Sequence, residues 1–140
     1  VLDESGMEPV QNRIEKLPFM DWRQLPAVIA GLDINLMPLE NSLFHWCKSE
    51  NKWTEAALVK VPSVMSRNCE MEYVVENGKD GWMCTTKEEW VNALEALVTD
   101  EKARKAMGEA AHQKVMEHYL TVNTGKDAME ELLCSESYTK

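Results

Sequence analysis

The polar segment 48–55 contains the residue types that bind phosphate groups and sugar hydroxyls. Lys48 and Ser49 stand where a loop is predicted to enter a helix, and Lys52 and Glu55 follow Ser49 at intervals of three residues. The free backbone N–H groups and the dipole at a helix start favour an anion such as a diphosphate. A carboxylate further along the helix accepts hydrogen bonds from paired sugar hydroxyls. The spacing therefore predicts a site for a phosphorylated ligand.

A purely structural interpretation of this segment also stays open. Ser49 would then act only as the N-cap of the helix, and the charged residues after it would form a solvent-exposed face with local ion pairs. Two residues of the preceding loop, Asn41 and Phe44, are weaker candidates for contact with the sugar side of a ligand.

Metal binding and thiol catalysis are not expected from this sequence. The four cysteines form no C-x-x-C pair and the three histidines are scattered, whereas zinc ligands come in closer groups. We expect reduced thiols in a cytosolic protein rather than two disulfides, and His45 as an exposed or capping residue. No metal and no other cofactor is predicted. The cysteines are Cys47, Cys69, Cys84 and Cys134.

Composition and charge exclude several other classes of protein. With 140 residues, 44% of them hydrophobic, the chain can bury the core of about one domain. Its formal net charge of −9 argues against nucleic-acid binding, which depends on Lys and Arg. No stretch reaches the roughly 18 apolar residues of a membrane span, and the N-terminal part does not resemble a signal peptide. We expect a cytoplasmic location, which includes the inner face of the cell membrane.

Three short apolar runs are predicted to be strands. They cover residues 34–37, 63–65 and 82–84, and Pro38 ends the first while Pro62 opens the second. Their apolar character on both sides of the chain is typical of strands in a buried parallel sheet.

Helices are predicted from capping signals and apolar periodicity. Asp21 with Gln24, and Thr86 with Glu89, have the spacing of capping boxes, and Asp100 is a further predicted N-cap. The helix after Thr86 has a predicted buried stripe of Trp90, Val91, Leu94, Leu97 and Val98. The predicted helices cover about residues 21–31, 49–59, 86–98, 100–119 and 125–134, with a helical turn at 72–75.

The alternation of helices with short apolar strands predicts an α/β fold. We expect one doubly wound, Rossmann-like domain over residues 1–140, with helices on both faces of a parallel sheet and a helical C-terminal end. Such sheets bind ligands beyond the carboxyl ends of their strands. The candidate loops are therefore those after Met37, Met65 and Cys84, and the first of them leads into segment 48–55.

Several stretches also occur in the order found in one enzyme family. They are residues 33–39, Phe44, 48–57, 61–66 and 72–83. Together they resemble the C-terminal domain of glycosyltransferase family 4, and more narrowly its polysaccharide and O-antigen branch. The signature of that branch, Lys-Ser-(acid)-x-Lys-x-x-Glu-(Ala/Tyr)-Ala, is matched by residues 48–57. The resemblance covers about residues 17–120.

The resemblance implies a retaining, metal-independent glycosyltransferase of the GT-B type with two facing Rossmann-like domains. This chain would be the C-terminal, donor-binding domain, with the N-terminal acceptor domain absent, so that the isolated chain is expected to be inactive. The implied partners are a nucleotide-diphosphate sugar and, through the missing domain, a glycan or lipid-linked acceptor. The implied pathway is cell-surface polysaccharide synthesis, with peripheral membrane association of the full-length protein.

The resemblance also suggests roles for single residues. The family's paired-glutamate motif places two Glu eight positions apart, and Glu55 matches the second, which contacts the ribose hydroxyls. The first position holds Cys47, which cannot act as a carboxylate. Lys48 and Ser49 replace it in this branch, and we assign them to the diphosphate or the hexose, with Lys52 as a supporting cation.

Two alternatives to a transferase domain stay open. One is a non-catalytic nucleotide- or phosphate-binding module of the flavodoxin-like kind. Such a module would need an acidic cluster at the strand ends for Mg²⁺, and Asp33 is a poor candidate for a member of that cluster. The other is a structural or partner-binding domain that has lost its site, and Cys47 in place of the first Glu is the feature that supports it.

Overall fold

A parallel sheet forms the centre of the fold in the computed structural model, which describes residues 8–126 and 129. The strands in these residues are β1 (Asn35–Met37), β2 (Ser63–Ser66) and β3 (Trp82–Cys84), in the order β1-β2-β3. Both pairs are parallel. The prediction of the strands is confirmed, although β1 begins one residue later and β2 ends one residue later than expected.

The strand register places a row of methionines across one face of the sheet. Met37 is opposite Met65, and Met65 is opposite Met83. This face packs against α3 (Asn51–Leu58), α4 (Cys69–Val74) and α6 (Glu101–His118), with Trp53 of α3 fully buried in the cluster. Long flexible Met side chains fill the irregular space between a sheet and three helices.

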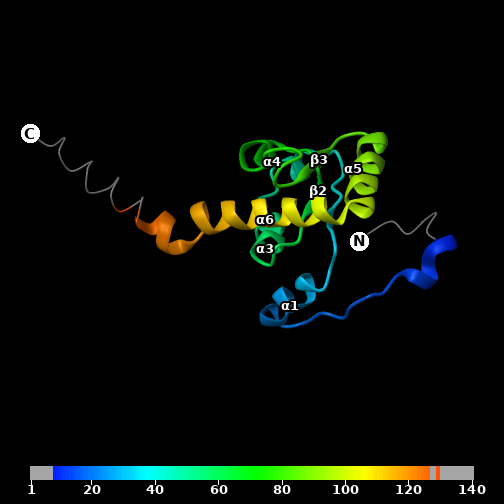
Figure 1. The fold of residues 1–140 in the computed structure, drawn as a ribbon, viewed down its shortest axis with the longest axis horizontal. Coiled ribbons are helices and arrows are strands. Elements are labelled where there is room, and N and C mark those ends of the chain that lie inside the picture. Colours follow the sequence, from blue (N-terminus) through cyan, green and yellow to red (C-terminus); the bar gives the residue numbers. More distant parts are fainter. Residues whose placement is uncertain (1–7, 127–128, 130–140) are drawn as a thin grey trace, which may run out of the picture.

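The other face of the sheet is covered by α5 (Lys87–Thr99). Val64 and Cys84 point to this side because side chains alternate along a strand, and they pack with Ala93 and Leu97 of α5. Figure 1 shows the sheet between these helices, with α6 running across the molecule. Because helices cover both faces of the sheet, the predicted doubly wound α/β arrangement is confirmed.

β1 lies at one edge of the sheet and is less covered than its neighbours. Leu36 points to the same side as α5, but 51% of its surface is exposed. Figure 1 shows α1 (Leu25–Ala30) below α3, with which it packs through Ile29 and Ala56, and the 3-10 helix Glu8–Arg13 apart from the sheet.

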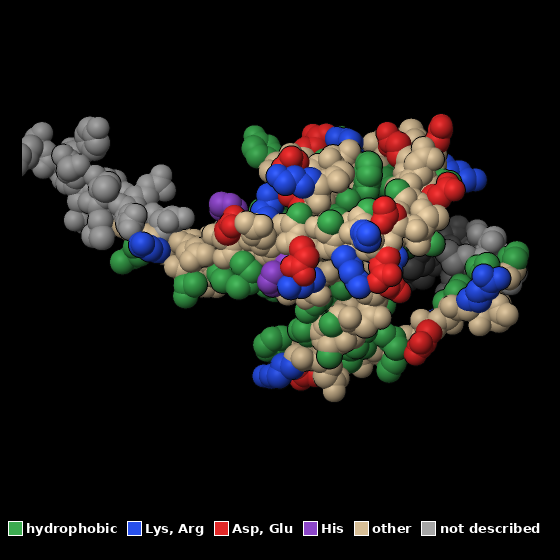
Figure 2. Space-filling view, viewed as in Figure 1, with side chains coloured by type: hydrophobic (Ala, Val, Ile, Leu, Met, Phe, Trp, Pro, Cys, Tyr) green, Lys and Arg blue, Asp and Glu red, His purple; other side chains and the backbone are tan. Residues whose placement is uncertain are grey.

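The predicted caps of the two long helices are confirmed. The Thr86 hydroxyl accepts a hydrogen bond from the Glu89 N–H, and the Glu89 carboxylate accepts from the Thr86 N–H at 3.0 Å, which completes the capping box of α5. Asp100 accepts from the N–H groups of Lys102 and Ala103 and caps α6. Figure 2 shows acidic and basic side chains intermixed over this face of the molecule, and Glu101 of α6 pairs with Lys105 at 2.7 Å.

Two helix starts differ from the prediction. Ser49 is not an N-cap: α3 begins after Glu50, which makes no side-chain cap bond, and Ser49 lies in the preceding loop. The capping serine of this region is Ser42, whose hydroxyl accepts from the His45 N–H and starts the unpredicted short helix α2 (Leu43–Trp46). Ser42 has the extended backbone conformation that an N-cap requires.

The predicted helix at 21–31 is divided into two parts. Asp21 caps a 3-10 turn, Trp22–Gln24, by accepting from the Arg23 N–H rather than by a capping box with Gln24. The α-helix α1 then begins at Leu25 with Pro26 in its first turn, where the missing N–H is not needed.

The boundaries of two further helices and the buried face of α5 also differ from the prediction. α4 begins at Cys69, three residues before the predicted helical turn, because the Asn68 side chain caps it. In α5, Val91 and Val98 are 52% and 66% exposed, and Ala93 takes their place in the core. Residues 121–126 are already helical, so the last helix starts before Gly125, and its predicted end lies outside the described residues.

No helix within the described residues is both long enough and apolar enough to cross a membrane.

Candidate functional site

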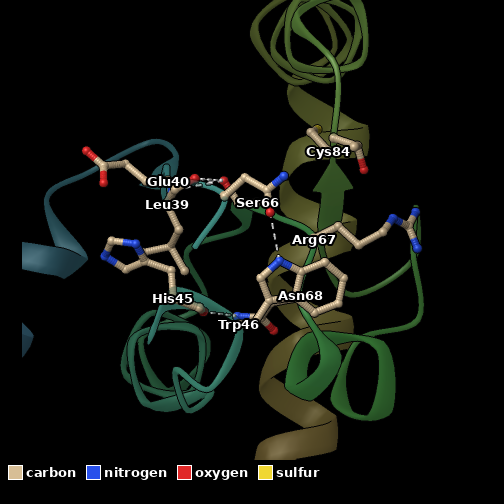
Figure 3. A pocket seen from close by; sticks show the side chains of 10 residues that line it. Leu39, Glu40, His45, Trp46, Ser66, Arg67, Asn68 and Cys84 are labelled. Atoms are coloured by element: carbon tan, nitrogen blue, oxygen red, sulfur yellow. Dashed lines mark hydrogen bonds between the residues drawn. The ribbon is translucent and has the colours of Figure 1, made fainter. Parts of the chain in front are cut away.

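A pocket of about 200 Å³ lies beyond the carboxyl ends of the three strands (Figure 3). The segments that follow β1, β2 and β3 each contribute to its lining, and α2 closes it on one side. This is the edge of the sheet where the sequence predicts a ligand site. The lining residues are Leu39, Glu40, Asn41, His45, Trp46, Ser66, Arg67, Asn68, Cys84 and Thr85.

Ser66 joins the first two of these segments. Its hydroxyl accepts from the Leu39 N–H at 2.8 Å and donates to the Leu39 carbonyl oxygen at 3.2 Å. The chain after β1 is thus fixed to the end of β2. Figure 3 shows these two residues side by side at the rim of the pocket.

Asn68 holds the opposite side of the pocket together. Only 2% of its surface is exposed. Its side-chain oxygen accepts from the Met71 N–H at 2.8 Å, and its amide nitrogen donates to the carbonyl oxygens of His45 and Lys48, each at 3.5 Å. One buried amide therefore caps α4 and also positions the loop between α2 and α3.

Two further hydrogen bonds shape α2 next to the pocket. The Trp46 indole N–H donates to the Asn41 side-chain oxygen at 2.9 Å. The Ser42 hydroxyl lies 2.9 Å from His45 Nδ1, so His45 belongs to the cap of α2, as the sequence predicts. These contacts form the α2 side of the pocket from residues 41–46, which are close together in the sequence.

Arg67 is the only Lys or Arg among the residues that line the pocket. Its guanidinium pairs with the Glu72 carboxylate at 3.2 Å, and in Figure 3 it extends away from Leu39 and His45. Burial raises the pKa of the Cys84 thiol, with a smaller contribution from the charge of Glu89. The thiol is therefore neutral at pH 7, and it adds no negative charge that would repel an anion.

Of the six predicted site residues, only Asn41 lines the pocket. Phe44 is 69% exposed on the outer side of α2, and Lys48 Nζ lies 4.2 Å from the centre of its ring. The Lys48 backbone lies next to the pocket, since its carbonyl oxygen accepts from the pocket residue Asn68, while its side chain forms a cation–π contact with Phe44.

The other predicted residues lie in the loop before α3, in the case of Ser49, and on the outer face of α3. Ser49, Lys52 and Glu55 are all exposed, because Trp53 and the alanines beside Glu55 form the buried face of the helix. Within the described residues, the Glu55 carboxylate has neither a hydrogen-bond nor a salt-bridge partner. The structure thus separates the predicted set into a pocket residue, a surface pair next to it, and a row along α3.

The sequence predicts the loops after Met65 and Cys84 as part of a ligand site, but no single residue in them was identified. Ser66, Arg67 and Asn68 follow directly after a predicted strand, and a polar triplet at a strand end is a signal that could have identified them. Thr85 follows β3 in the same way. No group of three His, Cys, Asp or Glu that could hold a metal ion occurs in the described part of the chain.

The fold defines a class of protein: a Rossmann-like domain that matches the C-terminal domain of GT-B proteins, here with a pocket at the strand ends. One solved example is the C-terminal domain of LpcC, a glycosyl transferase group 1 family protein from Francisella tularensis. It aligns with 74% of this chain and 52% of its own chain, with a TM-score of 0.56 and 18% sequence identity. The predicted fold class is confirmed.

The sequence shows the family directly. The family profile described as "Glycosyl transferases group 1" matches residues 3–100. The chain belongs to this family. No curated protein matches it. The aligned part spans about half of the LpcC domain, and at 18% identity that likeness describes the fold alone.

Proposed function

We propose that this chain is the donor-binding part of a retaining glycosyltransferase, which transfers a sugar from a nucleotide-sugar to a glycan or lipid-linked acceptor. The main support is the pocket at the carboxyl ends of β1, β2 and β3 in a chain of glycosyltransferase group 1. Doubly wound sheets bind nucleotides at this edge. The branch signature at residues 48–57 points to cell-surface polysaccharide synthesis as the pathway.

In this proposal Lys48 and Ser49 contact the donor diphosphate. Asn68 fixes the Lys48 backbone beside the pocket, and the first free N–H groups of α3 follow three residues later, from Asn51 on. To reach a phosphate, Lys48 Nζ must leave the Phe44 ring. An exposed cation–π contact is worth about 0.5–1 kcal/mol, and a hydrogen bond to a charged group about 1.5–3 kcal/mol. The exchange therefore favours the phosphate.

Arg67 is a second cation for the diphosphate in this proposal. Its pair with Glu72 is exposed, with 36% and 50% of the two side chains accessible. Such pairs contribute about 0–1 kcal/mol. Turning the guanidinium from Glu72 to a bound phosphate costs little, and the ligand gains a charged donor that can bind two oxygens.

The ribose is assigned to Glu55, with Lys52 as a supporting cation and Asn41 and Phe44 on the sugar side. Glu55 has no partner within the described residues, so its carboxylate is free to accept from two hydroxyls. The contribution of this domain to catalysis is to position the donor and to stabilise the charge of the departing diphosphate.

An NMR titration with UDP, GDP and ADP, each with and without Mg²⁺, tests this proposal. We expect shifts centred on residues 45–55 and 66–68 and no requirement for Mg²⁺. Glu55→Ala and Arg67→Gln should each weaken binding about tenfold, the loss of one charged hydrogen bond. Glu95→Ala on α5 and Arg23→Gln before α1 are matched controls, since both residues are exposed and outside the site.

Two results would count against the proposal. If the Glu55→Ala and Arg67→Gln variants bind the nucleotide with the same affinity as the control variants, the nucleotide binds elsewhere. A folded chain that binds no nucleotide, also when joined to the rest of its protein, would favour a structural domain that has lost its site.

A further inference from the structure

Two exposed cysteines lie in neighbouring segments next to the pocket. Cys47 follows α2, and Cys69 is the first residue of α4. The Cys69 thiol donates to the Trp46 carbonyl oxygen at 2.9 Å. The two segments are also joined by Asn68, whose amide nitrogen donates to the carbonyl oxygens on either side of Trp46 and Cys47.

The separation of the two cysteines follows from the Cys69 bond. In a trans peptide, the carbonyl oxygen lies roughly 3 Å from the Cα atom of the next residue. The Trp46 oxygen is therefore close to the Cα atom of Cys47, and the Cys69 sulfur lies within roughly 6 Å of that atom. Adding the Cα–Sγ distance in Cys69 gives a Cα–Cα separation of roughly 8.5 Å at most.

A relaxed disulfide spans about 4.4–6.8 Å between Cα atoms. Closure therefore requires an approach of roughly 2 Å at most. The segment that would move, residues 47–49 between α2 and α3, is exposed and contributes nothing to the buried core. Both sulfurs are also open to a reagent in solution.

We propose that Cys47 and Cys69 form a thiol pair that small-molecule disulfides oxidise to an intramolecular disulfide. The Cys47 thiolate attacks one sulfur of R–S–S–R, which forms a mixed disulfide and releases R–S⁻. The Cys69 thiolate then attacks the Cys47 sulfur and expels the second R–S⁻. Each released R–S⁻ takes up the proton that a cysteine has lost. Two electrons pass from the cysteines to the reagent, which leaves as two R–SH.

Cys84 does not take part in this chemistry. Only 2% of its surface is exposed, and burial raises the pKa of its thiol, so that little thiolate is present at pH 7. It serves as an internal control. Cys134 lies outside the described residues and is replaced by Ser in every sample.

The disulfide would connect the two sides of the pocket rim. His45 and Trp46 line one side, and Arg67 and Asn68 line the other. The reduced protein holds them together through hydrogen bonds to backbone carbonyls, which open and close in solution. A covalent bond at the same place restricts that opening. This inference concerns the thiols alone and does not depend on the proposed donor site.

Peptide mapping after incubation with oxidised glutathione tests the proposal. Trypsin places the three cysteines in separate peptides, residues 24–48, 68–79 and 80–87. In the Cys134→Ser protein, we expect peptides 24–48 and 68–79 to be joined, with two hydrogens lost and no glutathione retained. Peptide 80–87 should stay unmodified. Adding Cys69→Ser should leave glutathione on peptide 24–48.

Hydrogen exchange gives a second readout. The amides of residues 45–48 should exchange several-fold more slowly in the oxidised protein than in the reduced protein, and Cys47→Ser should abolish the difference. Circular dichroism confirms that the serine variants are folded. Glutathione found separately on both peptides, without a linked product, would overturn the proposal, as would a disulfide that includes Cys84.

Discussion

Glu89 makes the start of α5 sensitive to acid. Its carboxylate accepts from the N–H groups of Thr85 and Thr86, and these bonds hold its pKa below the usual value of 4.5. Because the folded pKa is lowered, the stabilisation is complete above the unfolded pKa and is lost as the pH falls through the folded value. We expect Glu89→Gln to reduce the loss of Tm between roughly pH 6 and pH 3.

Thermal melts across this pH range check the effect. Glu88→Gln is the matched control, since the neighbouring carboxylate accepts no hydrogen bond within the described residues. If both variants keep the pH dependence of the unchanged protein, the two backbone hydrogen bonds do not determine the acid response.

Lys114 is the partner of a buried carboxylate. It donates to Asp80 at 2.5 Å and to the Val74 carbonyl oxygen at 2.7 Å, and the Asp80 side chain is only 3% exposed. Lys114→Met would leave Asp80 with one hydrogen bond, from the Glu76 N–H. We expect a loss of about 2–4 kcal/mol in the free energy of unfolding by urea. Lys102→Met, on the exposed side of α6, should change it by less than about 0.5 kcal/mol.

Gly108 determines how closely α6 approaches the turn between α3 and β2. A Cβ atom at this position would lie 2.1 Å from the Lys60 carbonyl oxygen. Lys60 itself has φ 64°, a conformation that restricts how the turn can yield. Gly108→Ala should therefore cost about 2–4 kcal/mol of stability, measured by urea unfolding.

Gly125→Ala is the control for this substitution. Gly125 is also helical, and its Cβ would meet nothing within 4 Å. It should be neutral or stabilise by up to about 1 kcal/mol. Equal effects of the two substitutions would show that helix propensity, and not contact with Lys60, determines the result at Gly108.

Local signals predicted most of these elements, and non-local contacts explain the errors. The capping box at Thr86 and the cap at Asp100 involve neighbours within three residues, so the sequence contains all that is needed. α2 was missed because a four-residue helix depends on tertiary support, here from Asn68. The pocket combines segments after three strands, and local periodicity contains no information about their register. The predicted site residues therefore came from segment 48–55 and the loop before it, Asn41 and Phe44, and did not include Arg67.

The central strand β2 couples the two halves of the core. Met65 packs with α3, α4 and α6, and Val64 packs with α5 on the other face. Met65→Ala and Val64→Ala should each destabilise the protein by about 2–4 kcal/mol. Both should lower one cooperative transition, with tryptophan fluorescence and circular dichroism changing together. A variant that shifts only one of the two signals would mean that the two faces unfold separately.

The position of β1 at the edge of the sheet has a consequence for handling this chain in isolation. Asn35 bonds toward β2, so the N–H and C=O groups of Leu36 point outward by alternation, next to an apolar side chain that is half exposed. Within the described residues no further strand pairs with this edge of β1, and such an edge is a template on which further copies can add and start an aggregate. Leu36→Lys should therefore slow the rise of light scattering in concentrated samples while the circular dichroism spectrum stays the same.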